Sequence, residues 1–321
     1  MRIVSLFDGC GGARLALHNL GITDIEYYAS EVDKYAMIIA NKNFPDIWQV
    51  GDVEKISGHD FESPNLLIGG SPCQGLSNAG KQLGFDDPRS KLFWEYVRVY
   101  HELEPDYFLL ENVASMKQID QDIITEALGV EPVMINSSLL TAQNRKRLYW
   151  ANFTINQPED AGILLKDVVF NDAFPVVLHN LYGGFKEKSV RVFRGKSPTI
   201  RTSGGGGHIP SFVLEELIHS KEAIEYMNRR VKDGRNHWDF AHHSDVQDNK
   251  SSAVVANFFK GVPYNVFKDW KVIRKFHPIE CERLQGMPDN YTEGVSNTQR
   301  YKMIGNGFTI PVIEHILKEI I

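Results

Sequence analysis

Residues 2–21, RIVSLFDGCGGARLALHNLG, carry the clearest structural signal in the chain. The apolar run Ile3 to Phe7 is typical of a buried strand, and the apolar residues from Ala13 to Leu20 recur at helical spacing before Gly21. The glycines between them let the backbone approach a nucleotide-like ligand at the carboxyl end of the strand. A dinucleotide fingerprint would need a third glycine where Arg14 stands, so the pattern disfavours NAD.

The same alternation of strand and helix patterns continues through the first half of the chain. Helical patterns cover Asp33 to Phe44 and Ser90 to Leu103, each followed by a proline. The further apolar runs are Ile25 to Ser30, Ile47 to Val53, Asn65 to Ile68, Tyr107 to Leu110, Val133 to Ile135 and Leu148 to Phe153. Such alternation predicts an α/β fold with a largely parallel sheet covered by helices.

The second half is punctuated by glycines and contains only short extended pieces, such as Val190 to Phe193 and Pro198 to Arg201. We interpret it as a smaller, irregular region whose loops contact a partner. Helical patterns return at about Lys221 to Val231 and at Ile310 to Ile321, and the last one is expected to pack on the first domain.

Composition excludes several classes of protein. With 321 residues, 42% of them hydrophobic and 24% charged, the chain is typical of a globular protein with about two cores. The net charge of −6 disfavours a protein that coats nucleic acid through overall basicity. Three cysteines favour a reducing compartment over a disulfide framework. There is no signal-peptide pattern and no run of about 18 apolar residues that could span a membrane.

The charge is unevenly distributed. Acidic side chains predominate in residues 1–150, whereas the stretch Lys186 to Arg201 has six basic residues against Glu187 alone. This segment is either a contact for a polyanion or a solvated charged face.

Three groups of residues suggest chemistry at the ends of the strands. Glu31 and Asp52 follow the second and third strands, where a carboxylate can accept a ribose hydroxyl or an exocyclic amine. Cys73 follows the next strand in a turn of glycines and Pro72, a setting that favours a reactive thiolate. Residues 74–90 after it have the glycines of a mobile lid, with Lys81 and Arg89 as anion contacts.

Two further segments complete this set. Glu111 ends the strand Tyr107 to Leu110 and can donate a proton to a ring nitrogen if its pKa is raised. In the extended segment Gln143 to Arg147, Arg145 and Arg147 lie on one face and suit carbonyl or phosphate oxygens.

Taken in order, these motifs resemble the cytosine-C5 DNA methyltransferase family of prokaryotic or phage type. The resemblance spans nearly the whole chain. It rests on Phe7 to Gly12, Pro72 to Gln74, Glu111 to Val113, Gln143 to Arg147, Pro198 to Ile200, Arg274 to Tyr291 and Gly305 to Gly307.

The resemblance implies a Rossmann-like methyltransferase sheet and a smaller target-recognition domain. The catalytic domain would comprise 1–153 plus about 295–321, and the recognition domain about 154–294 with an insertion at 208–272. The implied reaction transfers a methyl group from S-adenosyl-L-methionine to C5 of a flipped-out cytosine in a specific duplex DNA sequence, through a covalent bond from Cys73 to C6.

The resemblance also assigns the residues. The implied catalytic residues are Cys73, Glu111, Arg145 and Arg147. The implied cofactor contacts are Phe7, Gly9, Cys10, Gly11, Glu31, Val32, Asp52, Val53, Pro72, Leu92 and Asn306. The expected DNA contacts are Gln74, Ser77, Lys81, Arg89, Gln143, Lys186, Arg191, Arg194, Thr199 and Arg201.

The partners follow from the same resemblance: double-stranded DNA, no membrane, and a cognate restriction endonuclease as a functional rather than a physical partner. A monomer in the cytoplasm of a bacterial or phage-infected cell is expected. No metal is expected, because His237, His242, His243 and Asp245 have no cysteine nearby and no zinc-motif spacing.

The main alternative is a tRNA cytosine-C5 methyltransferase, which shares the catalytic motifs. Members of that group carry a Cys-Phe-Thr signature, and no cysteine of this chain is followed by Phe-Thr. A catalytically inactive DNA-binding module is a second alternative, which the presence of Cys73, Glu111 and Arg145 disfavours.

Overall fold

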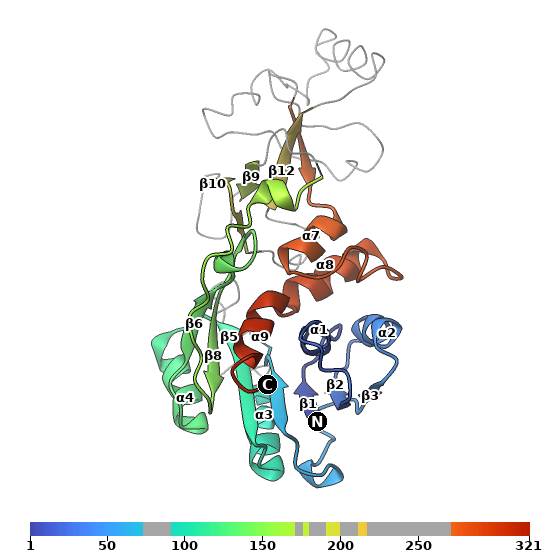
Figure 1. Cartoon of the computed structure of the whole chain (residues 1–321), viewed down its shortest axis with the longest axis vertical. Coiled ribbons are helices and arrows are strands. Elements are labelled where there is room, and N and C mark those ends of the chain that lie inside the picture. Colours follow the sequence, from blue (N-terminus) through green and yellow to red (C-terminus); the bar gives the residue numbers. More distant parts are fainter. Residues whose placement is uncertain (73–90, 171–175, 180–190, 200–210, 217–270) are drawn as a thin grey trace.

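The computed structural model describes residues 1–72, 91–170, 176–179, 191–199, 211–216 and 271–321 (Figure 1). Its helices are α1 (Gly12–Asn19), α2 (Lys34–Asn43), α3 (Lys91–Leu103), α4 (Gln118–Leu128), α7 (Pro278–Leu284), α8 (Asn297–Asn306) and α9 (Ile310–Leu317). Its strands are β1 (Arg2–Leu6), β2 (Glu26–Ser30), β3 (Ile47–Gln49), β4 (Leu66–Gly69), β5 (Tyr107–Val113), β6 (Val133–Asn136), β7 (Gln143–Asn144), β8 (Lys146–Ala151), β9 (Val176–His179), β10 (Arg191–Arg194), β11 (Ser197–Pro198), β12 (Ser211–Glu216) and β13 (Lys271–Lys275).

A seven-stranded sheet forms the body of the molecule, in the order β3-β2-β1-β4-β5-β8-β6. The five strands from β3 to β5 are parallel, whereas β8 runs antiparallel to both of its neighbours. The register aligns Leu6 of β1 with Gly69 of β4, and Gly69 with Leu110 of β5. The loops that follow these three strands therefore leave the sheet at one edge, which is where parallel α/β sheets bind ligands.

Helices cover both faces of this sheet, because its strands are apolar on both sides. Along β1, Ile3 belongs to one buried cluster, whereas Val4 and Leu6 belong to the other. The Ile3 cluster includes residues of α1, α2, α7, α8 and α9, and the second cluster includes residues of α3 and α4. The α/β prediction is thus confirmed.

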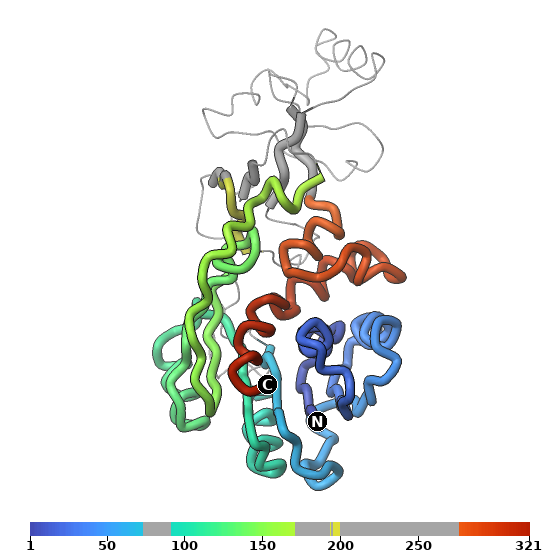
Figure 2. The backbone as a smooth tube through the Cα atoms, viewed as in Figure 1, coloured from blue at the N-terminus to red at the C-terminus, as the bar shows by residue number. Residues whose placement is uncertain are grey.

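The C-terminal helices lie between the sheet body and a second, four-stranded sheet in the order β10-β9-β12-β13 (Figure 1). Figure 2 follows the backbone of α7, α8 and α9 down to the sheet body. All neighbours in this small sheet are antiparallel. The sequence pattern predicts only irregular structure in this region, because its alternation is too short and too interrupted by glycines to reveal the pairing.

The helix bounds agree with the predicted ones to within two residues for the first three helices, and Gly21 ends the turn after α1 with φ +81°. The last helix ends at Leu317, and it packs against α1 as expected, with the Asn19 amide donating to Glu314 Oε1 at 2.6 Å. The predicted helix at Lys221 to Val231 lies outside the described residues.

The ends of two strands differ from the predicted ones in a way that changes where predicted site residues lie. β3 ends at Gln49 because Gly51 turns the chain with φ +83°, so Asp52 lies in a loop. β5 continues to Val113, so Glu111 lies within the strand, opposite Tyr149 of β8.

The expected domain bounds stay a prediction. Residues of the segment 276–291, which falls in the expected recognition domain, pack into the same core cluster as β1 and α1.

Candidate active site

The glycine-rich turn after β1 is built from unusual backbone conformations. Phe7, Gly9 and Gly11 have φ angles of +59°, +62° and +82°. Such angles suit glycine and are rare for phenylalanine. Within the described residues, nothing lies within 4 Å of the position that a Cβ on Gly9 would take. The turn therefore leaves open space beside its own backbone, as a ligand cradle requires.

Glu31 closes this turn from the end of β2. Its Oε2 accepts the Gly9 N–H at 2.8 Å, and its Oε1 accepts the N–H groups of Val32 and Asp33 at 2.7 and 2.8 Å. These bonds fix the direction of the carboxylate and leave Oε2, which accepts only the Gly9 N–H, capacity for a second donor. Beside it, the Val32 side chain is 71% exposed, which is unusual for a large apolar residue next to a buried strand.

Asp52 lies at the next position along the same edge. Its Oδ1 accepts the Glu54 N–H at 3.1 Å, and Lys55 Nζ is 3.9 Å from Oδ2. Val53 beside it is buried in the core. The predicted cofactor residues of the first three strands thus lie at one edge of the sheet.

Two side chains of the turn point into the protein. Burial raises the pKa of the Cys10 thiol to about 12, so it stays a neutral thiol. Burial also raises the pKa of Asp8 to about 6, against the opposing effect of hydrogen bonds from Ser5 and Tyr27. A ligand in the cradle would meet Cys10 only through its backbone.

Glu111 is held beside the strand that leads to Pro72 and Cys73. Its Oε1 pairs with Arg147 Nε at 2.7 Å, and both side chains are 13% exposed. A Cβ on Gly70 would lie 3.1 Å from Glu111 Oε2, so the absence of a side chain there lets β4 and this carboxylate come close together. The pair supplies an acid and a cation at the edge of the sheet.

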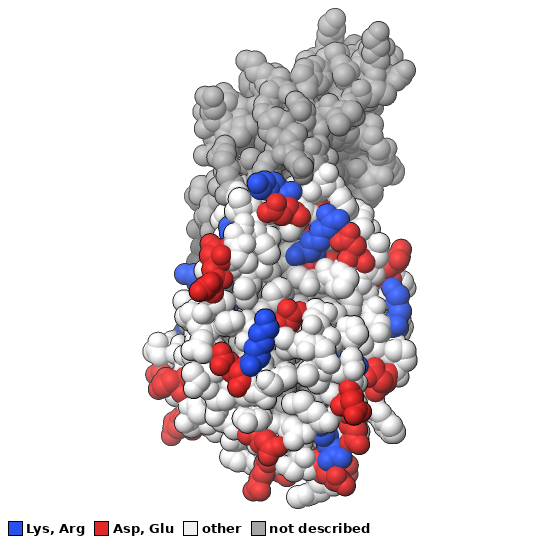
Figure 3. All heavy atoms as spheres, in the orientation of Figure 1, with Lys and Arg blue, Asp and Glu red and all other residues white. Residues whose placement is uncertain are grey.

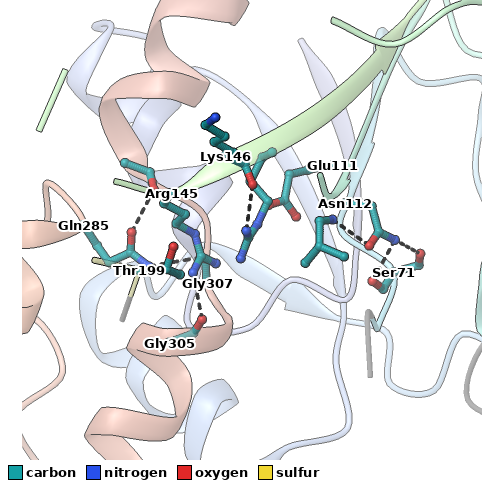
Figure 4. A network of polar contacts seen from close by, with 12 residues as sticks. Ser71, Glu111, Asn112, Arg145, Lys146, Thr199, Gln285, Gly305 and Gly307 are labelled. Atoms are coloured by element: carbon teal, nitrogen blue, oxygen red, sulfur yellow. Dashed lines mark hydrogen bonds and ion pairs between the residues drawn. The ribbon is translucent and has the colours of Figure 1, made fainter. Parts of the chain in front are cut away.

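Asn112 fixes the backbone just before the predicted nucleophile (Figure 4). Its Nδ2 donates to Ser71 Oγ at 3.1 Å and to Ser71 O at 3.4 Å, and both residues are buried. Pro72 follows and is half-buried. The end of β5 thus has two roles. Glu111 is the acid of the site, and Asn112 supports the segment that leads to Cys73.

Arg145 connects the same region to the C-terminal helices. Its guanidinium donates to Gly305 O at 3.2 Å and to Gly307 O at 3.0 Å, and the residue is only 3% exposed (Figure 4). Asn306, the predicted cofactor contact between these two glycines, is exposed. In this structure the Arg145 side chain fixes the C-terminal end of α8, where Asn306 lies, while Arg147 lies beside Glu111.

Two of the expected DNA contacts, and one further lysine of the basic segment, have internal partners. Gln143 is fully buried, with Nε2 donating to Leu284 O and Gln285 Oε1, both at 3.1 Å. Thr199 is half-buried and donates to Asn144 O at 2.6 Å. Within the basic segment, Lys196 Nζ donates to three backbone carbonyls, those of Ser138, Thr141 and Ile163, at 2.7, 3.3 and 2.6 Å. These contacts give Lys196 a structural role and remove one cation from the proposed polyanion surface.

Other predicted residues are only partly placed or lie outside the described part of the chain. Leu92 is half-buried in α3 and packs against the second core cluster, and Arg191 and Arg194 are the first and last residues of β10. Outside the described residues lie Cys73, Gln74, Ser77, Lys81, Arg89, Lys186 and Arg201, and so do the four metal candidates of the insertion. In the described ranges, no group of three or more metal-ligating side chains occurs.

Comparison with known proteins identifies the family. The model of the C-5 cytosine-specific DNA methylase family matches residues 1–321, the whole chain. The chain belongs to this family. It is a DNA cytosine-C5 methyltransferase, as the order of its motifs predicted.

Several curated relatives of the methyltransferase are Type II enzymes. It is 30% identical to Type II methyltransferase M1.ScrFI of Lactococcus lactis subsp. cremoris, with all of this chain and 78% of that protein covered. It is 26% identical to Type II methyltransferase M.HhaI of Haemophilus parahaemolyticus, over 98% of this chain and 93% of that one. These matches favour the DNA enzyme over the tRNA enzyme.

Solved structures confirm the fold of the methyltransferase. A mutant of Spodoptera frugiperda DNMT2 superimposes with a TM-score of 0.63 at 18% identity, covering 99% of this chain and 98% of that one. A putative DNA modification methyltransferase from an E. coli prophage gives a TM-score of 0.60 at 20% identity, with the same coverage.

Two residues that shape the site of this methyltransferase were not among those predicted from the sequence. Tyr291, the last residue of the Arg274 to Tyr291 motif, donates its hydroxyl to Cys10 O at 2.8 Å across 281 positions of sequence. Asp8 is buried under the glycine turn. The polar side chain of Asp8 inside an otherwise glycine-rich turn was a visible signal, whereas nothing near Tyr291 in the sequence could have indicated its partner.

Proposed function

We propose that the enzyme binds S-adenosyl-L-methionine at the glycine turn and methylates C5 of a flipped-out cytosine within a specific duplex DNA sequence. The observation that carries this proposal is the common edge of the sheet. The loops after β1, β4 and β5 leave it in this order, so the segment after β4 that ends at Pro72, the residue before Cys73, lies between the open cradle at Gly9 and the strand that carries Glu111. A methyl donor and a reacting base need this adjacency.

The residues at the cradle fit the proposed cofactor. Glu31 and Asp52 offer carboxylate oxygens to ribose hydroxyls and an exocyclic amine, and the exposed Val32 offers an apolar surface to a purine ring. Phe7, Pro72, Leu92 and Asn306 complete the proposed contacts, with the backbone of Cys10 and Gly11 and with Val53 behind them. The cofactor supplies the methyl group that C5 receives.

The proposed chemistry at the base uses the chain's own groups. The Cys73 thiolate forms a bond to C6 of cytosine, while Glu111 donates a proton or a hydrogen bond to N3, so that C5 becomes nucleophilic. After methylation, a base removes the proton from C5, the Cys73–C6 bond breaks, and the thiolate is regenerated. Arg147, paired with Glu111, keeps that carboxyl oriented and is available to the O2 atom of the base, while Arg145 is proposed to support the site through its hydrogen bonds to Gly305 O and Gly307 O.

The proposed DNA contacts lie in the recognition region and in residues 74–90. C5 and C6 are stacked inside a duplex, so the target base must leave the helix before Cys73 can reach it. The Type II names of the relatives support a specific duplex sequence as the substrate and a restriction endonuclease as the functional partner.

Over the described ranges, no helix combines the length and hydropathy that a membrane crossing requires.

The experiment that tests the proposal is covalent trapping. Bisulfite sequencing of DNA from cells that express the enzyme first identifies the recognised site. Duplex DNA with 5-fluorocytosine in that site is then expected to form a covalent adduct with the enzyme, and only when S-adenosyl-L-methionine is present. Fluorine at C5 cannot leave as a proton, so the Cys73–C6 bond persists. The Cys73→Ala variant is expected to form no adduct and to lose methylation, while it still binds DNA.

The matched control is Cys281→Ala, which removes a buried thiol in α7 and should preserve the adduct. Turnover by Cys73→Ala would exclude Cys73 as the nucleophile. An adduct formed with tRNA and not with any duplex DNA would contradict the DNA substrate.

A further inference from the structure

A hydroxyl from the C-terminal part of the chain holds the glycine turn. Tyr291 donates to Cys10 O at 2.8 Å and lies 3.4 Å from Gly11 O. Its side chain is buried, and a Cβ on Gly11 would lie 3.3 Å from its hydroxyl oxygen. The peptide unit between Cys10 and Gly11 is therefore held by a side chain from the C-terminal part of the chain.

The Tyr291 hydroxyl is a permanent donor. Burial raises the pKa of this phenol well above its usual value, so it keeps its proton at every pH at which the enzyme works. Its backbone is also tied down, because Asn43 Nδ2 of α2 donates to Tyr291 O at 3.0 Å. The hydroxyl thus has little freedom to leave the turn.

A buried ion pair sets the position of Tyr291. Glu282 of α7 is fully buried, and its Oε2 accepts the N–H of Asn290 at 2.8 Å. Its Oε1 accepts the N–H of Thr292 at 2.9 Å and pairs with Arg300 of α8 at 2.8 Å. The residues on both sides of Tyr291 are therefore anchored to one carboxylate, which would be strongly disfavoured in the core without these partners.

The turn needs such an anchor. Phe7, Gly9 and Gly11 all have positive φ angles within five residues, and a chain free to leave these conformations would lose its ligand-binding shape. Holding a loop in its bound conformation raises affinity because less conformational entropy is lost on binding.

We propose that Tyr291 is a positioning residue for the cofactor: its hydroxyl keeps the Cys10–Gly11 peptide in the conformation that binds S-adenosyl-L-methionine. This inference rests on the proposed binding of that cofactor at the glycine turn. Tyr291 acts through the backbone of the turn and not on the reacting atoms.

The test compares Tyr291→Phe with Tyr301→Phe in the full-length enzyme. Tyr301 is a matched control because its hydroxyl also donates to a backbone carbonyl, that of Phe276 at 2.6 Å, on a different segment. Removal of one such hydrogen bond at the turn is expected to raise the Kd for S-adenosyl-L-methionine about 3- to 10-fold in Tyr291→Phe. Tyr301→Phe should bind within about two-fold of wild type, and both variants should show similar shifts in Tm.

Kinetics separate positioning from chemistry. In Tyr291→Phe, the KM for the cofactor should rise as the Kd does, while kcat at saturating cofactor stays within about two-fold. A fall in kcat with unchanged KM, unchanged cofactor binding in Tyr291→Phe, or equal weakening in both variants would each overturn the role of Tyr291. If wild type itself bound no S-adenosyl-L-methionine in calorimetry, the proposed cofactor would be wrong, and this role with it.

Discussion

At the scale of the residue, Asp8 is a carboxyl placed where its charge is unfavourable. It is 4% exposed, and its Oδ1 accepts hydrogen bonds from Ser5 Oγ and Tyr27 OH, each at 2.6 Å. Its Oδ2 has no partner within the described part of the chain. Burial and the nearby charge of Glu31 raise its pKa from 3.8 to about 6.

This shift predicts a pH-dependent stability. Because the folded state holds the Asp8 proton more tightly than the unfolded state, the stabilising contribution is complete below about pH 4 and is lost as the pH rises through about 6. Asp8→Asn keeps an oxygen for Ser5 and Tyr27 but carries no charge. Relative to wild type, its free energy of unfolding should therefore improve between pH 4 and pH 7 by roughly 2 kcal/mol.

Urea unfolding of the two proteins without cofactor at a series of pH values measures this difference, and the contributions of the other acids cancel. A difference that stays constant from pH 4 to pH 7 would mean that Asp8 titrates at its ordinary pKa.

Sequence reasoning at this scale identifies residue types but not partners. The family resemblance assigned both Glu111 and Arg147 to catalysis, and in the structure Arg147 Nε lies 2.7 Å from Glu111 Oε1. It gave no indication that Gln143 is fully buried or that Lys196 binds three carbonyls. Those partners come from segments that meet only in the folded chain, so a local pattern cannot specify them.

At the scale of the element, glycines decide where helices can end and pack. Gly286 follows α7 with φ +74°, and a Cβ there would lie 2.2 Å from Pro311 Cδ in α9. Gly21 follows α1 with a similar φ of +81°, but nothing described lies within 4 Å of its Cβ position. The two sites share backbone strain and differ in steric contact.

Substitution by alanine separates the two effects. Gly21→Ala should lower the free energy of unfolding by about 1–2 kcal/mol through the left-handed conformation alone. Gly286→Ala should lower it by about 1–3 kcal/mol more, because the ring of Pro311 cannot move without displacing the start of α9. Chemical denaturation measures the free energy of unfolding of both variants. Equal losses in Gly21→Ala and Gly286→Ala would show that α9 moves aside without cost.

Strands and helices were largely predictable, and so was the parallel direction of most strands, whereas the reversed direction of β8 was not. Apolar runs located β1, β2 and β4 because buried parallel strands are apolar on both faces. Such a run has the same appearance whether the strand is parallel or antiparallel, so the reversal at β8 was not visible. In the small sheet the strands are short, and the pairing of β9 with β12 joins segments far apart in sequence.

At the scale of the whole molecule, the net charge of −6 is a poor guide to the surface that binds DNA. On the face drawn in Figure 3, acidic side chains are scattered over the sheet body with lysines and arginines among them. The concentrated basic charge belongs to the segment Lys186 to Arg201, of which Lys196 has internal partners.

Salt dependence tests whether that segment binds phosphates. Replacement of Lys186, Lys188, Arg191 and Arg194 by glutamine should weaken DNA binding and lower the slope of log K against log salt by about 1 for each phosphate that is no longer neutralised. Lys196→Gln is the matched control: it should lower Tm because three carbonyls lose a donor, and it should leave the slope unchanged. An unchanged affinity and slope in the fourfold variant would exclude the segment as a DNA-binding surface.

The packing of α1 against α9 has a consequence for synthesis. Asn19 and Glu314, which meet across it, are 295 positions apart, and the ribosome needs roughly 15–60 s to add that many residues. During this time the apolar face of α1 emerges without the helix that covers it, and the glycine turn emerges without Tyr291. The first strand and helix of a nascent chain therefore reach their final environment only after α9 and Tyr291 have been synthesised. Contacts between segments so far apart in sequence form slowly.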